Sequence, residues 1–188
     1  MRCRVVGRSF TVPFVTGHRD VLDQVEGLRS LAIAQAGVVR RDQLAALGVS
    51  RFHVRSHVAA HRWRALGPNL VVLATGRLRR EQELIAGPLH CGPSAALDGW
   101  SALERDGLKG WTRSDVHVVV PHGTKPAPLP GLVVHQSRQL PDVDIVGGPP
   151  RSVTSARAAM DAAGWLPTPR AATGLVIAVA QQRLATPA

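Results

Sequence analysis

Residues 41–73, RDQLAALGVSRFHVRSHVAAHRWRALGPNLVVL, hold the pattern that decides the fold of the first half of this chain. Asp42 can cap a short helix that ends at Gly48, and Ser50 can cap a second helix that runs to about Ala60. Two short helices joined by such a turn are the arrangement of a helix-turn-helix. The spacing of the caps therefore predicts this motif.

The segments on either side of these helices extend the pattern. Two apolar stretches within Trp63–Leu73 flank Gly67-Pro68-Asn69, which predicts a β-hairpin with an irregular turn. Upstream, apolar residues at helical spacing predict a helix over Gln24–Ala36, and Val38-Val39 leaves room for a short strand. Three helices followed by a hairpin are the order of elements in a winged helix. The sequence therefore predicts a winged helix-turn-helix domain over residues 24–76.

The rest of the chain alternates predicted helices and strands. We expect a small mixed α/β domain over residues 77–188 and an α+β fold for the whole chain, with residues 1–23 as a flexible basic arm. The predicted helices are Leu78 to about Ala86, ended by Gly87-Pro88; a helix capped by Asp98 and stopped at Gly107; Ser152–Ala163; and about Arg170–Leu184. The predicted strands are Ala95–Leu97, Val116–Val120 and Leu132–His135.

Charge separates the two halves of the chain. The 188 residues carry 23 Lys+Arg against 13 Asp+Glu, a formal net charge of +10. Residues 1–80 contain fourteen arginines and four acids, whereas residues 81–188 contain nine basic and nine acidic residues. The whole excess therefore lies in the first half, which favours a polyanion as the partner of that half.

The helix that follows Ser50 is the predicted reader of double-stranded DNA. Val54 and Val58 lie four residues apart and define a buried stripe, so the other positions face outward. In a major groove Arg reads guanine and Ser reads several bases, whereas basic residues outside the helix face phosphates. A plain solvated basic helix is the alternative, but the neighbouring elements and the charge favour DNA. The candidate DNA-contacting residues are Arg40, Arg41, Ser50, Arg51, His53, Arg55, Ser56, Arg62 and Arg64.

Signatures of catalysis and of metal binding are weak. Zinc sites need three or four converging ligands, and no acid or cysteine completes a set around the clustered histidines. No activated serine or cysteine, paired carboxylates or phosphate-binding glycine loop stands out. We therefore expect no enzyme activity, no catalytic residues, no metal and no cofactor. The histidines considered are His53, His57 and His61 on one helix, and His117, His122 and His135 on or beside two strands.

The sequence also bears on location. No apolar run approaches the ~18 residues that a membrane span needs; the best, Leu175–Ala180, is far shorter. Arg8 interrupts any apolar stretch near the start, so no signal peptide is expected. Cys3 and Cys91 make no disulfide framework. We expect a cytoplasmic protein with no membrane partner.

Several blocks of the sequence carry a family resemblance. AQAGVVRRDQLAALGVSRFHVRSHVAAHRWRALGPNLVVL, residues 34–73, is similar to the N-terminal winged helix of the AbiEi family of antitoxins, the DNA-binding halves of type IV toxin–antitoxin systems. DVHVVVPHG, GLVVHQSRQL, TSARAAMDAA and QQRLATPA resemble the second domain of that family. The chain departs from the family at His61, where a glycine is usual, and at Val71, where a tyrosine is usual in the wing strand.

The resemblance implies a transcriptional repressor that binds inverted repeats in its own promoter. The recognition helix would be Ser50–Ala60 and the wing Trp63–Leu73. The second domain would serve to neutralise a nucleotidyltransferase-like toxin, functionally and without necessarily forming a stable complex. Many similar chains continue into a nuclease-like module that has no counterpart in these 188 residues, so no nuclease function is implied.

Two other functions remain open from the residues alone. Residues 78–188 can be a protein-interaction module that the basic winged helix only tethers to nucleic acid. A histidine-dependent metal hydrolase is the third hypothesis.

Overall fold

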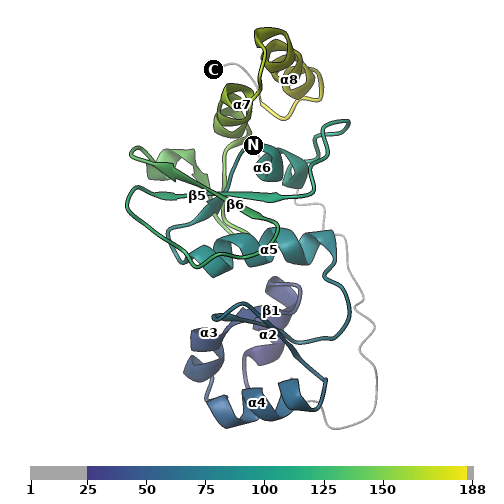
Figure 1. Ribbon diagram of the computed structural model, residues 1–188, viewed down its shortest axis with the longest axis vertical. Coiled ribbons are helices and arrows are strands. Elements are labelled where there is room, and N and C mark those ends of the chain that lie inside the picture. The colour runs from purple at the N-terminus through teal and green to yellow at the C-terminus, as the bar shows by residue number, and fades with distance from the viewer. Residues whose placement is uncertain (1–24, 186–188) are drawn as a thin grey trace, which may run out of the picture.

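The computed structural model describes residues 25–185, and these form an α+β arrangement of seven α-helices and two sheets (Figure 1). The predicted arm over residues 1–23 lies outside the described residues. The helices are α2 Leu28–Ala34, α3 Arg41–Ala46, α4 Arg51–Ala59, α5 Arg80–Cys91, α6 Gly99–Arg105, α7 Ser155–Gly164 and α8 Pro169–Gln181, with a 3-10 turn η1 at Asp142–Asp144. The strands are β1 Val38–Arg40, β2 Arg64–Leu66, β3 Leu70–Val72, β4 Ala96–Leu97, β5 Val116–Pro121, β6 Leu132–Ser137, β7 Ile145–Val146 and β8 Ser152–Val153.

The first sheet has three antiparallel strands in the order β1-β3-β2. Strands β2 and β3 form the predicted hairpin, with Ala65 opposite Val71. The two faces of the sheet bury different partners: Val39 and Val71 belong to the core shared with α2, α3 and α4, whereas Val38 and Leu70 pack against α5. The sheet is thus covered on both sides, which suits its nearly all-apolar strands β1 and β3.

Local chemistry explains where the first helices begin. The Ser50 hydroxyl oxygen accepts a hydrogen bond from the backbone N–H of His53 at 3.2 Å, which confirms the predicted cap of α4. The predicted cap at Asp42 is wrong, because α3 already begins at Arg41 and the Gln43 side chain accepts from the Arg40 N–H at 2.9 Å. Asp42 instead lies in the first turn, where a carboxylate is favourable near the helix N-terminus.

Two other predicted helices start later in the structure than the sequence indicated. Helix α2 begins at Leu28 and not at Gln24, because Gly27 has a left-handed φ of 82° that interrupts helical geometry. Helix α7 begins at Ser155 and not at Ser152, because Ser152 and Val153 pair as strand β8 beside β4 and β7. Pairing with a neighbouring strand is information that periodicity along the chain does not contain.

Helix α5 continues through Gly87-Pro88, so the predicted end at Ala86 is wrong. Pro88 has no N–H and costs the helix one hydrogen bond, which burial of the surrounding residues offsets. Gly87 is a packing position: a Cβ there would lie 2.8 Å from Val116 Cγ1 and 3.0 Å from Val118 Cγ2. The glycine lets the helix approach β5 closely.

Helix α5 lies between the two sheets (Figure 1). Ile85 and Ala86 pack on β1 and β3, whereas Leu84 belongs to the core of the five-stranded sheet. The Gln82 amide donates to the Ala36 carbonyl at 2.9 Å. One helix therefore ties residues 25–76 to the rest of the described chain.

The second sheet is mixed, as predicted, with the order β6-β5-β4-β8-β7. Strands β5 and β6 are parallel, with Val118 opposite Val134, and the loop between them passes over α5. The His90 ring nitrogen Nε2 lies 2.8 Å from the Ala127 carbonyl oxygen of that loop. Helices α6 and α7 cover the other face of the sheet, and α8 packs on α7 at the far end from α4 (Figure 1). Within residues 25–185, no helix is long and apolar enough to cross a bilayer.

Candidate nucleic-acid interface

Helix α4 presents its polar side chains outward. Val54 is 3% exposed and Val58 half-buried, so both lie on the inward stripe that the sequence predicted. Arg51, His53, Arg55 and Ser56 are all exposed, which agrees with the predicted outward positions. Ser50 is exposed too, but its hydroxyl oxygen is already used in the cap.

Three arginines of this surface are unpaired. Arg51, Arg55 and Arg62 are exposed, and none of their side chains has a hydrogen bond or ion pair with any residue between 25 and 185. A guanidinium is always charged and binds phosphate through two parallel N–H groups. These three side chains are therefore available to a polyanion without breaking an existing contact.

The other three predicted arginines are engaged in the fold. Arg40 is held by Asp42 through two hydrogen bonds of 2.9 and 2.6 Å, and this contact lowers the pKa of the Asp42 carboxyl below its usual value. Arg41 Nε donates to the Pro68 carbonyl at 3.0 Å, and an Arg64 N–H donates to the Gly76 carbonyl at 2.6 Å. Arg41 and Arg64 keep their net charge beside the hairpin, whereas that of Arg40 is neutralised.

Trp63 fixes the hairpin on α4. Its side chain is 5% exposed and stacks on the His57 ring, with centroids 4.3 Å apart and planes at 18°. His57 therefore faces inward and away from His53. In the described part of the chain no group of three or more His, Cys, Asp or Glu residues could hold a metal ion.

His61 ends helix α4. It is exposed and has a left-handed φ of 52°. A φ in this region costs a residue with a Cβ more than glycine. At this position the AbiEi family, which the sequence resembles, usually has a glycine.

One exposed residue of α4 was not among the predicted contacts. Phe52 is 75% exposed and adjoins Arg51 and His53 on the outward side. A large apolar side chain in this setting can contact the methyl group of thymine in the major groove. Its position off the Val54 and Val58 stripe was the signal in the sequence that could have identified it.

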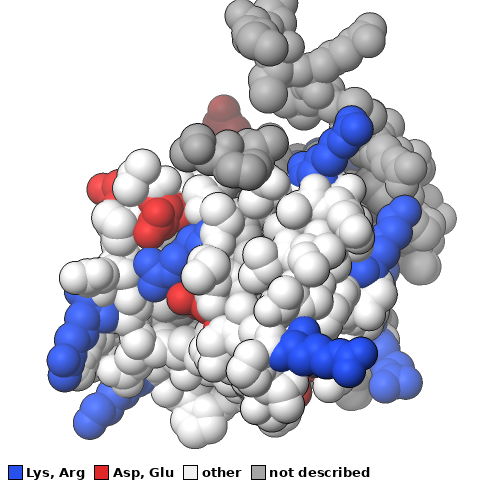
Figure 2. Space-filling view, turned by 90° about the horizontal axis from the view of Figure 1, so that it is seen from above, with Lys and Arg blue, Asp and Glu red and all other residues white. Residues whose placement is uncertain are grey.

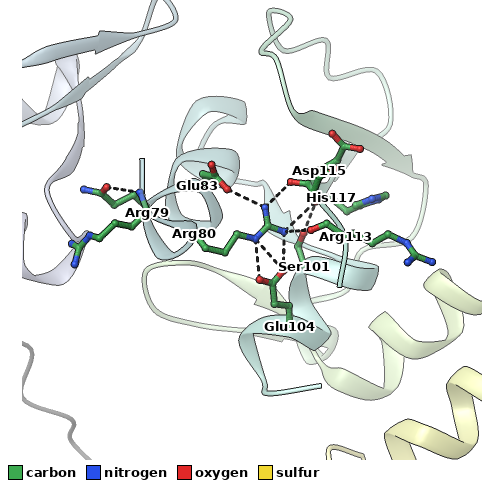
Figure 3. A network of polar contacts seen from close by, with 10 residues as sticks. Arg79, Arg80, Glu83, Ser101, Glu104, Arg113, Asp115 and His117 are labelled. Atoms are coloured by element: carbon green, nitrogen blue, oxygen red, sulfur yellow. Dashed lines mark hydrogen bonds and ion pairs between the residues drawn. The ribbon is translucent and has the colours of Figure 1, made fainter. Parts of the chain in front are cut away.

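Few acids oppose this positive charge. Residues 25–80 contain ten arginines, and Glu26 and Asp42 are their two acidic residues. Arg80 lies outside the interface, because its guanidinium is saturated by the fold (Figure 3). It donates to Glu104 at 2.7 to 3.2 Å, to Glu83 at 3.1 Å and to the carbonyls of residues 113–115. The contacts with Glu104, and then Glu83, raise the pKa of Arg80 further.

The structure also gathers a polar cluster that the sequence did not predict. His117 Nδ1 lies 3.0 Å from His135 Nε2, and the Trp165 ring stacks 3.8 Å from that of His135. Burial, followed by the charge of His135, lowers the pKa of His117 to about 4, and burial also lowers that of His135. The two rings are parallel-strand neighbours, which only the pairing of β5 with β6 decides.

A buried carboxyl belongs to Asp98, whose backbone N–H donates to the His117 carbonyl at 3.0 Å. Asp98 is 1% exposed and accepts from the Gly99 N–H at 2.7 Å as the cap of α6. Burial and the nearby Asp161 raise the pKa of Asp98 well above its usual value. Asp161 pairs with Arg157 at 2.5 Å, and Arg157 with Asp144 at 3.1 Å. These contacts join α6 and α7 to the sheet, and Asp144 and Arg157 also line a surface pocket with Gln139, Leu140 and Pro141.

The chain was compared with known proteins. No protein-family model matches it, and no curated protein sequence gives a significant match.

Proposed function

We propose that residues 24–76 form a winged-helix DNA-binding domain, that residues 77–188 form a second domain, and that the protein is a transcriptional repressor. Helix α4 would be the recognition helix and the β2–β3 hairpin the wing. The observation that carries the proposal is the set of exposed guanidiniums of Arg51, Arg55 and Arg62, which have no partner among residues 25–185 and lie in a segment with two acids. The order of helices, short strand and hairpin supports it.

The geometry suits a major groove. Nine helical residues give α4 a length of about 13 Å, close to the ~12 Å width of the groove. Arg51, His53, Arg55 and Ser56 would approach base edges, with Phe52 beside them. The phosphates would be contacted by Arg41, Arg62 and Arg64. Hydrogen bonds already position two of these: Arg41 donates to the Pro68 carbonyl in the hairpin turn, and Arg64 donates to the Gly76 carbonyl after the hairpin. Phosphate contacts would give affinity and base contacts specificity.

We propose further that this repressor is the antitoxin of a type IV toxin–antitoxin system and binds inverted repeats in its own promoter. The similarity of its sequence blocks to the AbiEi family supports this step. The second domain would act against a nucleotidyltransferase-like toxin without a stable complex, and no catalytic step is assigned to either domain. Co-expression with a nucleotidyltransferase encoded beside it should restore growth that this toxin alone arrests; continued arrest would contradict the antitoxin role.

DNA binding can be tested directly. Fluorescence anisotropy would compare a labelled duplex from the protein's own promoter with a scrambled duplex of equal length at ~150 mM salt. A specific repressor should prefer the promoter by about 10³-fold or more. Equal affinities would leave only a nonspecific nucleic-acid binder.

A second candidate is a protein-interaction module that the basic segment tethers to nucleic acid. The exposed apolar residues of α8 favour it, with Val176 41% and Ile177 48% exposed. Because α5 packs on both sheets, the full chain is the proper sample for its test. Two results together would favour this second function. The full chain would bind the promoter and the scrambled duplex equally, and it would bind another protein in a way that requires α8.

A further inference from the structure

A small pocket lies where the hairpin, α5 and the second sheet meet. It has a volume of about 110 Å³ and is lined by segments that are far apart in the sequence: the end of β2, the residue two positions before α5, α5 itself, the start of β5 and residues 129–132. Apolar pockets between structural units are common sites for small ligands. The larger side chains of the wall are Leu66, Leu78, Val116, Leu129 and Leu132.

Gly87 forms part of this wall without a side chain. A Cβ at this position would lie 3.3 Å from Leu132 Cδ1, so the glycine leaves the space beside β6 open. An apolar cavity of about 150 Å³ holds benzene. The pocket therefore admits a single ring or a short branched chain and nothing larger.

One charged group belongs to the wall. The Glu83 side chain is 39% exposed, and its Oε2 accepts from Arg80 Nη1 at 3.1 Å. No donor among residues 25–185 makes a hydrogen bond to its other oxygen, Oε1. One oxygen of a carboxylate at the pocket is therefore available to a ligand.

Arg80 does not neutralise this carboxylate, because Glu104 already does so for Arg80. Figure 3 shows the guanidinium of Arg80 between the two acids, and its hydrogen bonds to Glu104 measure 2.7, 2.9 and 3.2 Å. The three side chains together carry one net negative charge. A cationic ligand at Glu83 would balance it.

The surface as a whole is a poor binder of cations. The net charge is +10, and Figure 2 shows basic side chains on opposite sides of the end that carries α7 and α8, with acidic ones gathered at one side. Most of the surface therefore repels a small cation, and exposed acids offer it no apolar wall. The pocket at Glu83 combines both features.

We propose that this pocket binds a small primary amine. Its ammonium group would donate to Glu83 Oε1, and its single ring or short branched chain would fill the space between the leucines. Hydrogen bonds between charged groups are roughly twice as strong as neutral ones, and burial of the ring removes apolar surface from water. The charge selects an amine, and the volume limits its size.

The pocket adjoins the proposed wing. Leu66 lies opposite Leu70 in the hairpin, and the next residue, Gly67, is so close to the second domain that a Cβ there would lie 3.2 Å from the His90 ring. A bound amine would contact Leu66 and Leu129 at once and hold the hairpin against the loop. This step rests on the proposed DNA-binding function: the amine should change the affinity for the promoter, and the promoter should change the affinity for the amine by the same factor.

An NMR titration of the ¹⁵N-labelled full chain with benzylamine, up to about 10 mM, tests the site. The amide signals of Gly87, Ser114 and Gly131 should shift together and saturate, with a Kd of about 1 mM. Benzyl alcohol has the same shape without the charge and should bind about fivefold more weakly. Benzoate, which carries the opposite charge, should cause no saturable shift.

Three variants separate charge from shape. Glu83→Gln should bind benzylamine as weakly as the wild type binds benzyl alcohol, and Arg80 stays held by Glu104. Glu81→Gln is the matched control, because Glu81 is an exposed acid of the same helix outside the pocket, and it should bind as the wild type does. Leu78→Phe fills the pocket and should weaken the binding of both compounds.

The outcomes distinguish the two proposals. The absence of saturable shifts overturns the amine site, as do shifts confined to amides outside the pocket or equal weakening by Glu81→Gln and Glu83→Gln. Anisotropy titration of the promoter duplex with and without 10 mM benzylamine, in the wild type and in Glu83→Gln, measures the coupling. An effect lost in Glu83→Gln supports the link to the wing, and no effect refutes that link. A chain that binds benzylamine but no DNA would refute the proposed function and leave the amine site intact.

Discussion

Removal of the two unpaired arginines of α4 should weaken DNA binding without affecting the fold. Arg51 and Arg55 are exposed and have no polar partner among residues 25–185, so Arg51→Ala with Arg55→Ala should change the free energy of unfolding by less than about 0.5 kcal/mol. Each lost charge-assisted contact with DNA should cost about 1 to 1.5 kcal/mol, so the double variant should bind roughly 30- to 150-fold more weakly.

The salt dependence of the affinity distinguishes the kind of contact that is lost. Each phosphate contact contributes about 0.9 to the slope of log K against log salt concentration. Both arginines are proposed to lie at base edges; if they contact phosphates instead, the slope should fall by about 1.8. Ser56→Ala should reduce the preference for the promoter over the scrambled duplex and leave this slope unchanged, because a hydroxyl contacts a base without releasing a counterion.

Anisotropy titrations at four salt concentrations between about 50 and 200 mM provide the measurement. Arg138→Ala is the matched control, because Arg138 is an exposed arginine of the second half and its loss changes the net charge equally per residue. An equal loss of affinity in Arg138→Ala would show that only total charge matters. A large fall in melting temperature in the double variant would show that the outward face of α4 has been misassigned.

Three further predictions concern the fold. Gly87→Ala should lower the free energy of unfolding by about 1 to 2 kcal/mol, because the new Cβ would press on Val116 in a packed core, which outweighs the gain in helix propensity. Asp98→Asn should become more stable relative to the wild type as pH rises from about 4 to 8. Because the pKa of Asp98 is raised in the folded state, the unfolded chain releases that proton at a lower pH than the folded chain, and the wild type loses stability as pH rises. The difference in free energy of unfolding between Asp98→Asn and the wild type should therefore reach about 2 kcal/mol. His61→Gly should raise the stability by about 0.5 to 1 kcal/mol, because glycine adopts a left-handed φ without strain.

Urea denaturation measures each of these changes, at pH 5 and pH 8 for Asp98→Asn. Gly164→Ala is the control for Gly87→Ala, since a Cβ at Gly164 in α7 would meet nothing within 4 Å and should not destabilise. A stabilised Gly87→Ala, a pH-independent Asp98→Asn or a destabilised His61→Gly would contradict the corresponding argument.

Local sequence determined most of the structure of residues 25–76 and of the candidate interface. The Ser50 cap, the Val54 and Val58 stripe and the turn at residues 67–69 each act over a few neighbouring positions, so the chain itself specifies α4 and the hairpin. The outward positions of Arg51 and Arg55 follow from helical geometry alone. Whether an arginine is paired does not follow, and the engagement of Arg40 by Asp42 became visible only in three dimensions.

Tertiary structure decided the rest, because its causes join residues far apart in the chain. Gly87 and Pro88 end helices in most sequences, yet here the close approach of α5 to Val116 and Val118 keeps the helix intact. The parallel pairing of β5 with β6 brings His117 against His135, 18 residues away, and α7 then places Trp165 on both. Burial and pairing energies of this kind depend on which surfaces meet, and periodicity within a segment carries no information about its partner.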